Sequence, residues 1–137
     1  NSSMVNLIGK TVDAPGNKFE LGEGETETLS FSLGEDSSEV TIDIFNSAGT
    51  NVSTLSLGAQ SGGQKEFVWP GTDSSGVPLP AGTYTFGVTA EDASGNFVEA
   101  GTFSAGVVTD IIFEEGETFA IVNGQKVSVN EISKVSL

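Results

Sequence analysis

Apolar and polar residues alternate in many short segments of this chain, and such a period-2 pattern predicts β-strands that are buried on one face. The cleanest examples are residues 29–33 and 40–44, in which every second residue is Leu, Phe, Val or Ile. No window keeps an apolar period of 3.6 residues for three turns. From Leu29 to Phe103 we count about seven alternating segments separated by turn residues. The pattern predicts an all-β fold with an immunoglobulin-like or fibronectin-III-like β-sandwich.

The densest signal lies between residues 67 and 90. Phe67 and Trp69 share one face of a predicted strand, and Tyr84 and Phe86 share one face of the next strand. We expect all four aromatic rings to pack in the core. Because Trp69 shares a strand face with Phe67, we predict that it packs in the core and is not an exposed platform for stacking sugars.

The connection between these two strands is rich in turn residues. Pro70 and Gly71 suit a type II turn, since Pro fixes φ at the first central position and Gly accepts a positive φ at the second. Asp73 and Gly76 predict a turn with a side-chain acceptor and a left-handed residue. The hydroxyl of Tyr84 is expected to bond back to a nearby backbone group, as in a tyrosine corner.

Both ends of the chain also contain short strand patterns. Residues 107–113 predict one strand, and residues 118–122 and 125–129 flank Asn123-Gly124, a strong hairpin signal. Neither end has enough strands to be stable by itself. We therefore expect residues 1–25 and 106–137 to pair into one small barrel, with the sandwich, residues 26–105, inserted between them. We also expect a flexible connection at residues 58–63 and a short helical turn capped by Asn130.

Composition narrows the range of functions. The chain has 19 acidic and 5 basic residues, a net charge of −14, which disfavours binding to nucleic acids and to anionic membranes. It contains no Cys and no His, so disulfides and catalysis by thiol or imidazole groups are excluded. No apolar run is long enough for a transmembrane helix.

Carboxylates are the remaining candidates for chemistry. Asp43, Asp73, Glu91 and Asp92 are candidates for a catalytic pair, but their spacing pairs none of them. The loops at Asp73 and at Asp92 faintly resemble calcium loops, although each lacks the series of carboxylates and the distal Glu. We favour solvated strand and turn residues, and expect no catalytic, cofactor-binding or metal-binding residue. The sequence does not identify partner-binding residues.

The order of motifs resembles the C-terminal region of the bacterial flagellar hook-capping protein, also called the hook-assembly or basal-body rod-modification protein. The residues that carry the resemblance are Trp69, Gly71, Asp73, Gly76, Leu79, Pro80, Gly82 and Tyr84. An opening at residues 7–12 and an Ile-containing end at residues 130–137 match as well. Pro70 departs from the family, which usually has Asp or Asn there. The resemblance implies a Tudor-like barrel, made by both chain ends, around a fibronectin-like insert.

The same resemblance implies a function. The chain would be a structural, non-enzymatic part of the hook cap at the distal end of the growing hook, where it promotes polymerisation of hook subunits. Its partners would be hook subunits and copies of itself in a cap oligomer, mainly through an N-terminal region that this sequence lacks. No cofactor is implied. The alternative is a generic secreted immunoglobulin-like module for adhesion or carbohydrate binding.

Overall fold

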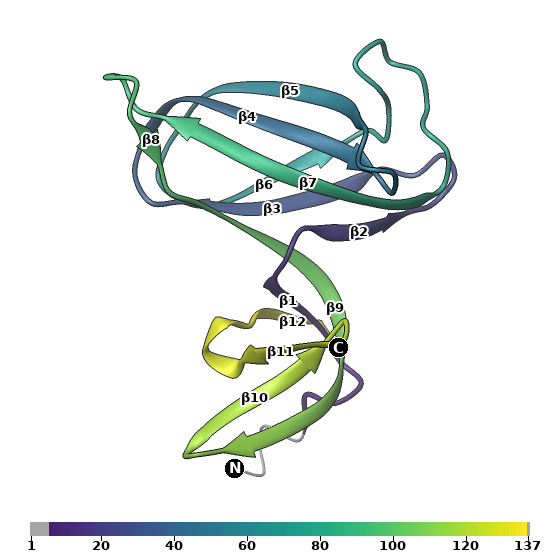
Figure 1. The fold of residues 1–137 in the computed structure, drawn as a ribbon, viewed down its shortest axis with the longest axis vertical. Helices are drawn as coiled ribbons and strands as arrows, with labels where there is room; N and C mark the ends of the chain where they lie inside the picture. The colour runs from purple at the N-terminus through teal and green to yellow at the C-terminus, as the bar shows by residue number, and fades with distance from the viewer. Residues whose placement is uncertain (1–5, 137) are drawn as a thin grey trace. The chain divides into compact units, whose positions relative to one another are not determined.

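The computed structural model describes residues 6–136, and the chain divides into two compact units. Unit 1 consists of Asn1–Gly16 and Phe103–Leu137, and unit 2 consists of Asn17–Thr102. The described residues form strands, turns and one short 3-10 helix, so the prediction of an all-β fold is confirmed (Figure 1). None of the helical segments described is long and apolar enough to cross a membrane.

Unit 2 contains two antiparallel sheets. One sheet has the order β2-β7-β4-β5, with β8 also paired to β7; in the other, β3 pairs with β6 and with β9 (Figure 1). The bounds are β2 Lys18–Leu21, β3 Glu27–Leu33, β4 Ser37–Asn46, β5 Asn51–Gln60, β6 Gly63–Trp69, β7 Gly82–Glu91, β8 Phe97–Val98 and β9 Ala100–Glu114. The early part of β9 belongs to unit 2, and its remainder, from Phe103, belongs to unit 1.

The core of unit 2 is formed by the residues that the alternation placed on inner faces. Leu29, Phe31, Ile42, Ile44 and Trp69 are at most 1% exposed. In β6 the neighbouring Val68 is 59% exposed, as the alternation requires. Burial of one such large apolar side chain contributes about 1.5–3 kcal/mol. The inner faces of these strands therefore hold the sandwich together.

One predicted boundary was wrong. We expected Phe19 and Leu21 in the barrel, but β2 pairs with β7 in unit 2, with Phe19 opposite Tyr84. Both Phe19 and Leu21 are buried in the core of unit 2. The first boundary therefore lies after Gly16 and not after residue 25, and the second lies after Thr102. The strand at the start of the chain that remains in unit 1 is β1, Thr11–Pro15.

Unit 1 joins both chain ends in one antiparallel arrangement, with the order β11-β10-β9-β1-β12. The further bounds are β10 Glu117–Val122, β11 Gln125–Ser128 and β12 Ser133–Ser136. β1 lies between β9 and β12, with Val12 opposite both Gly106 and Val135. The core is made of Val12, Ala14, Val108, Ala120, Val122 and Val127. The Tudor-like character of this unit stays a prediction.

The turns of unit 1 follow local sequence. Asn123 and Gly124 have φ of 52° and 78°, as a two-residue hairpin turn requires, so that prediction is confirmed. The helical turn is a 3-10 helix, Val129–Glu131. Its cap is Ser128, whose hydroxyl accepts from the backbone N–H of Asn130, and not Asn130 itself as expected. Ser128, two residues before Asn130, ends β11 and directly precedes the helix, so its hydroxyl reaches the free backbone N–H of Asn130.

The expected flexible connection at residues 58–63 is mostly strand, because β5 continues to Gln60 and β6 begins at Gly63. Gly58 lies opposite Val40, where the register between β4 and β5 shifts, and has φ of +69°. Such a glycine forms a β-bulge without steric cost. Gly58 therefore reshapes the β4–β5 pair and does not end it, and the chain leaves this sheet only at residues 61–62.

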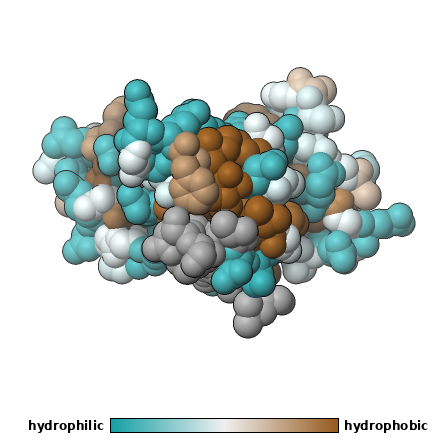
Figure 2. Space-filling model, turned by 90° about the horizontal axis from the view of Figure 1, so that it is seen from below, coloured by the Kyte–Doolittle hydropathy of each residue, from teal (hydrophilic) through white to brown (hydrophobic). Residues whose placement is uncertain are grey.

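Unit 1 also leaves some apolar side chains at its surface. Ile8, Val107 and Phe113 are 46%, 47% and 55% exposed. Hydrophobic side chains gather near the middle of the face that Figure 2 shows. Exposed apolar residues are common on folded proteins, and we assign no site to these.

Candidate functional site

The segment from Trp69 to Tyr84 begins with a fully buried tryptophan at the end of β6. Trp69 is 0% exposed, and its Nε1 donates a hydrogen bond to the carbonyl oxygen of Thr72 at 3.2 Å. Gly71 has φ of +77°, the sign that the expected turn needs. A Cβ atom on Gly71 would lie 2.4 Å from the carbonyl oxygen of Glu25. Glycine is therefore required here by both backbone conformation and space.

Asp73 organises the next turn. Its Oδ1 accepts hydrogen bonds from the backbone N–H of Ser75 at 2.8 Å and of Val77 at 2.9 Å. Gly76 follows with φ of +84°. The expected turn is therefore present, and the carboxylate of Asp73 is occupied by backbone donors.

The segment ends in a tyrosine corner. The hydroxyl of Tyr84 donates to the carbonyl oxygen of Pro80 at 2.6 Å, as predicted. The N–H of Leu79 donates to the carbonyl oxygen of Gly71 at 2.9 Å, which joins the two ends of the loop. Gly82, with φ of +154°, begins β7. The loop is long but is held by its own hydrogen bonds.

Four aromatic rings meet beneath this loop. Phe19 lies 5.9 Å from Trp69 in an edge-to-face arrangement, 6.1 Å from Tyr84 and 6.2 Å from Phe86, measured between ring centroids. Trp69 and Tyr84 are 6.1 Å apart. Sequence reasoning missed Phe19 because it was assigned to the barrel. The burial of Trp69 within this cluster leaves no ring face for stacking a sugar.

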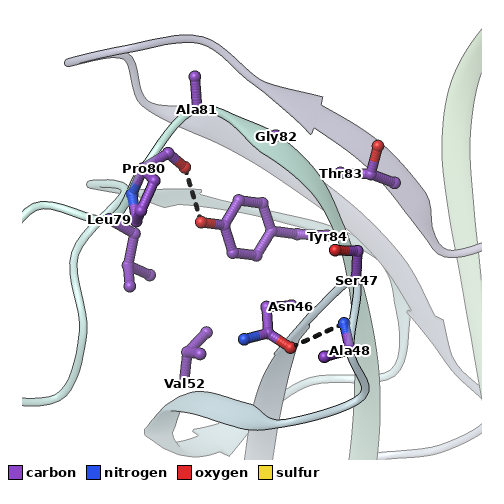
Figure 3. A pocket seen from close by; sticks show the side chains of 10 residues that line it. All are labelled: Asn46, Ser47, Ala48, Val52, Leu79, Pro80, Ala81, Gly82, Thr83 and Tyr84. Carbon is purple, nitrogen blue, oxygen red and sulfur yellow. Dashed lines mark hydrogen bonds between the residues drawn. The ribbon is translucent and has the colours of Figure 1, made fainter.

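A shallow cleft of about 250 Å³ opens between the β4–β5 turn and the end of the loop (Figure 3). It is lined by Asn46, Ser47, Ala48, Val52, Leu79, Pro80, Ala81, Gly82, Thr83 and Tyr84. In Figure 3 the side chains of Val52 and Leu79 point toward one another across the opening. No ionisable group other than the phenol of Tyr84 lines the cleft. The cleft can receive a small apolar group but offers no acid–base pair.

The candidate carboxylates are not brought into one site. Asp43 accepts from the hydroxyl of Thr54 at 2.7 Å. Asp92 caps its own turn through Oδ1, which accepts from the N–H of Ser94 and of Asn96. Glu91 lies opposite Glu39 and Phe97. Within residues 6–136, no three Asp or Glu side chains form a group that could hold a metal ion.

The carboxyl group of Glu27 lies at the edge of the core of unit 2. Partial burial, with a smaller effect of the nearby Glu25 carboxylate, raises the pKa of Glu27 above its ordinary value. Glu27 lies opposite Trp69 in the β3–β6 pair. Its position at the edge of the core, beside a like-charged carboxylate, explains the raised pKa without a catalytic role.

The match that decides the family covers the loop and most of unit 2. The model of the FlgD Ig-like domain matches residues 16–94, more than half of the chain. The chain belongs to the FlgD family. The resemblance to the flagellar hook-capping protein is thereby confirmed. The matched residues include the whole loop from Trp69 to Tyr84.

Known FlgD proteins are similar over different lengths. The basal-body rod modification protein FlgD of Salmonella typhimurium is 32% identical over 93 residues, which are 63% of this chain and 40% of that protein. A crystal structure of FlgD from P. aeruginosa has a TM-score of 0.74 and 27% identity, and the likeness covers 93% of this chain and 97% of the chain in that structure. The chain thus spans less than half the length of the curated relatives that it matches.

A second FlgD structure, from Xanthomonas campestris, has a TM-score of 0.70 and 22% identity and covers 98% of both chains. It is described as giving insights into the hook capping essential for flagellar assembly. At this identity the likeness supports the fold alone. Both structures match residues well beyond the Ig-like domain, so the likeness includes the ends of the chain.

Proposed function

We propose that this chain is the C-terminal part of a flagellar hook cap, located at the distal end of the growing hook, where it promotes polymerisation of hook subunits. The observation that carries the proposal is the match of residues 16–94 to the FlgD Ig-like domain. The name of the Salmonella typhimurium relative, a basal-body rod modification protein, supports a role in assembly of this structure. Its partners are hook subunits and other copies of the cap protein.

The chain acts in this role as a folded surface and not as an enzyme. The Trp69–Tyr84 loop uses its polar groups to hold itself: the Asp73 carboxylate, the Trp69 N–H and the Tyr84 hydroxyl all bond to the backbone. Polar side chains that bond to the backbone in this way stabilise the conformation of the loop. The loop therefore keeps the end of the sandwich rigid and able to present a fixed surface to an incoming subunit.

The test is to remove unit 2 from the protein as the bacterium makes it. Pro15 of β1 and Phe103 of β9 lie opposite one another in register, so Pro15 can be joined to Phe103 through Asn-Gly, which favours a two-residue hairpin turn. Unit 1 keeps its own core of six buried residues in this variant. The matched control carries the same two-residue insertion between Glu115 and Gly116, in an exposed turn of unit 1.

We expect cells with the unit 2 deletion to export the variant and to make few or defective hooks, while the control makes hooks of normal number and length. Hooks are counted by electron microscopy, and export is followed in the culture medium. Normal hooks in the deletion strain, with the variant exported and stable, would show that unit 2 is dispensable and would overturn the proposal.

A further inference from the structure

Phe97 is the most exposed large apolar side chain in the described part of the chain, at 80%. It begins β8, a two-residue strand that pairs with the end of β7. A single exposed apolar residue is common on a protein surface. Phe97 differs from such a residue in two respects: a hydrogen-bonded hairpin fixes its direction, and acidic residues lie next to it in the sheet.

The outward direction of Phe97 is fixed by the hairpin. The backbone N–H of Asp92 donates to the carbonyl oxygen of Asn96 at 2.9 Å, and the Oδ1 of Asp92 accepts from the backbone N–H groups of Ser94 and Asn96. This rigid turn sets Val98 opposite Ala90, and both are buried in the core. Because side chains alternate along a strand, Phe97 must point away from the core. Its exposure is therefore a property of the fold and not of a loose loop.

Acidic residues occupy positions next to Phe97 in the sheet. Phe97 lies opposite Glu91, and Glu91 lies opposite Glu39 on the next strand. Glu99, on the other side of Val98, is also exposed. Like charges directly opposite one another destabilise a sheet. Here the Glu39 carboxylate accepts from the hydroxyl of Ser56 at 2.7 Å, a bond that leaves its negative charge in place.

No lysine of the described residues forms an ion pair with Glu91 or Glu39. The ion pair given by the structure, 2.8 Å long, joins Lys126 to Glu114 in unit 1. There, too, two carboxylates face each other, Glu114 and Glu117, but a cation accompanies them. Phe97, Glu91 and Glu39 thus form a row across three strands, in which a firmly held aromatic ring lies beside two negative charges that no described lysine pairs with.

We propose that Phe97, Glu91 and Glu39 form a docking surface for a basic segment of a protein partner. An Arg or Lys side chain of the partner lies over the Phe97 ring, which attracts cations, and pairs with the two carboxylates. A divalent metal ion fits poorly, since calcium prefers six to eight oxygen ligands. The inference rests on the proposed function, because that function supplies the partner: a hook subunit, bound through a Lys- or Arg-bearing segment.

The experiment measures binding of this chain to purified hook subunits of the same bacterium, immobilised on a sensor surface, over a range of salt concentrations. The test variants are Phe97→Ser and the double variant Glu39→Gln with Glu91→Gln. The controls are Val68→Ser, which removes a 59% exposed apolar side chain from the other sheet, and Glu114→Gln with Glu117→Gln. The two double variants change the net charge equally.

We expect each test variant to weaken binding at least tenfold at low salt, and each control to change it by less than twofold. The Glu39/Glu91 variant should also lose most of the salt dependence, because charge pairing between partners is screened by salt. Its melting temperature should not fall, since the substitution removes a repulsion, so weaker binding will not reflect unfolding.

Two results would contradict the inference in different ways. If the wild-type chain binds hook subunits and the test variants bind as tightly, or if both double variants weaken binding equally, the docking surface is wrong and the proposed function stands. If the wild-type chain binds neither hook subunits nor assembled hooks, the proposed function fails and this surface loses its partner with it.

Discussion

Replacing Trp69 by Ala removes one ring of the aromatic cluster in unit 2. The side chain is 0% exposed, packs edge-to-face on Phe19 and Tyr84, and donates to the carbonyl oxygen of Thr72. Deleting a buried aromatic side chain typically costs about 3–5 kcal/mol. The two ring contacts and the hydrogen bond argue against the lower end of that range. We expect a loss of about 4 kcal/mol.

The assay is urea unfolding followed by far-UV circular dichroism, because the variant lacks the tryptophan on which fluorescence would depend. With a urea dependence of about 1.5 kcal/mol per molar, a loss of about 4 kcal/mol lowers the midpoint by roughly 2–3 M. Amide signals of β7 and of β10, followed by NMR, separate unit 2 from unit 1, since two units need not unfold together.

The matched control is Val68→Ala, one residue away on the same strand. Val68 is 59% exposed, so its truncation should change stability by less than about 0.5 kcal/mol. A midpoint for the Trp69 variant equal to that of the control would refute the packing argument. It would also revive the interpretation of Trp69 as an exposed binding platform.

Three further predictions concern single positions. Gly71→Ala should cost more than Gly76→Ala, because both residues have positive φ but only at Gly71 would the Cβ atom meet backbone, the carbonyl oxygen of Glu25; equal melting temperatures would contradict this. The hydroxyl of Ser53 is buried with no hydrogen-bond partner among the described residues, so Ser53→Ala should leave stability unchanged or raise it by about 1 kcal/mol, and a loss of that size in a denaturant titration would show the reasoning wrong. The pKa of Glu27 is raised in the folded chain, so its ionised form costs stability above that pKa and the cost disappears as pH falls and the group is protonated; Glu27→Gln should therefore raise the melting temperature at pH 7 but not at pH 3, and an equal effect at both pH values would exclude an ionisation origin.

The Trp69–Tyr84 loop could be predicted in detail because its structure is local. The turn at Asp73 needs only an acceptor side chain and a left-handed glycine a few residues later, both visible in the sequence. The tyrosine corner joins Tyr84 to Pro80, four residues away. Alternation then placed Trp69, Tyr84 and Phe86 on inner faces, where all three are buried.

The position of Phe19 could not be predicted in the same way. Its alternation with Leu21 fits a buried strand in either unit, because the pattern records only that one face is covered. The deciding contact is the pairing of Phe19 with Tyr84, which joins residues far apart in the sequence. Local pattern carries no information about such pairing.

The exposure of Phe97 was open to prediction but was missed. The residues from Asp92 to Asn96 have the composition of a turn, and the alternation that begins at Tyr84 and Phe86 puts Ala90 on the inner face. Continuing the hairpin register across that turn sets Val98 opposite Ala90 and leaves Phe97 outside. The missing step was to count residues through the turn, which would have indicated an exposed aromatic ring among carboxylates.

The central claim is that this chain works at the distal end of the growing hook, and the most direct test is to see where it lies. An epitope inserted between Glu115 and Gly116, two exposed residues of the β9–β10 turn, should be tolerated because loop tips accept insertions. The tagged protein is produced in its own bacterium and labelled with gold-conjugated antibody for electron microscopy of incomplete hooks. The account predicts gold at the distal tip of each growing hook. Gold at the hook base, or spread along its length, in cells that assemble normal hooks would contradict it.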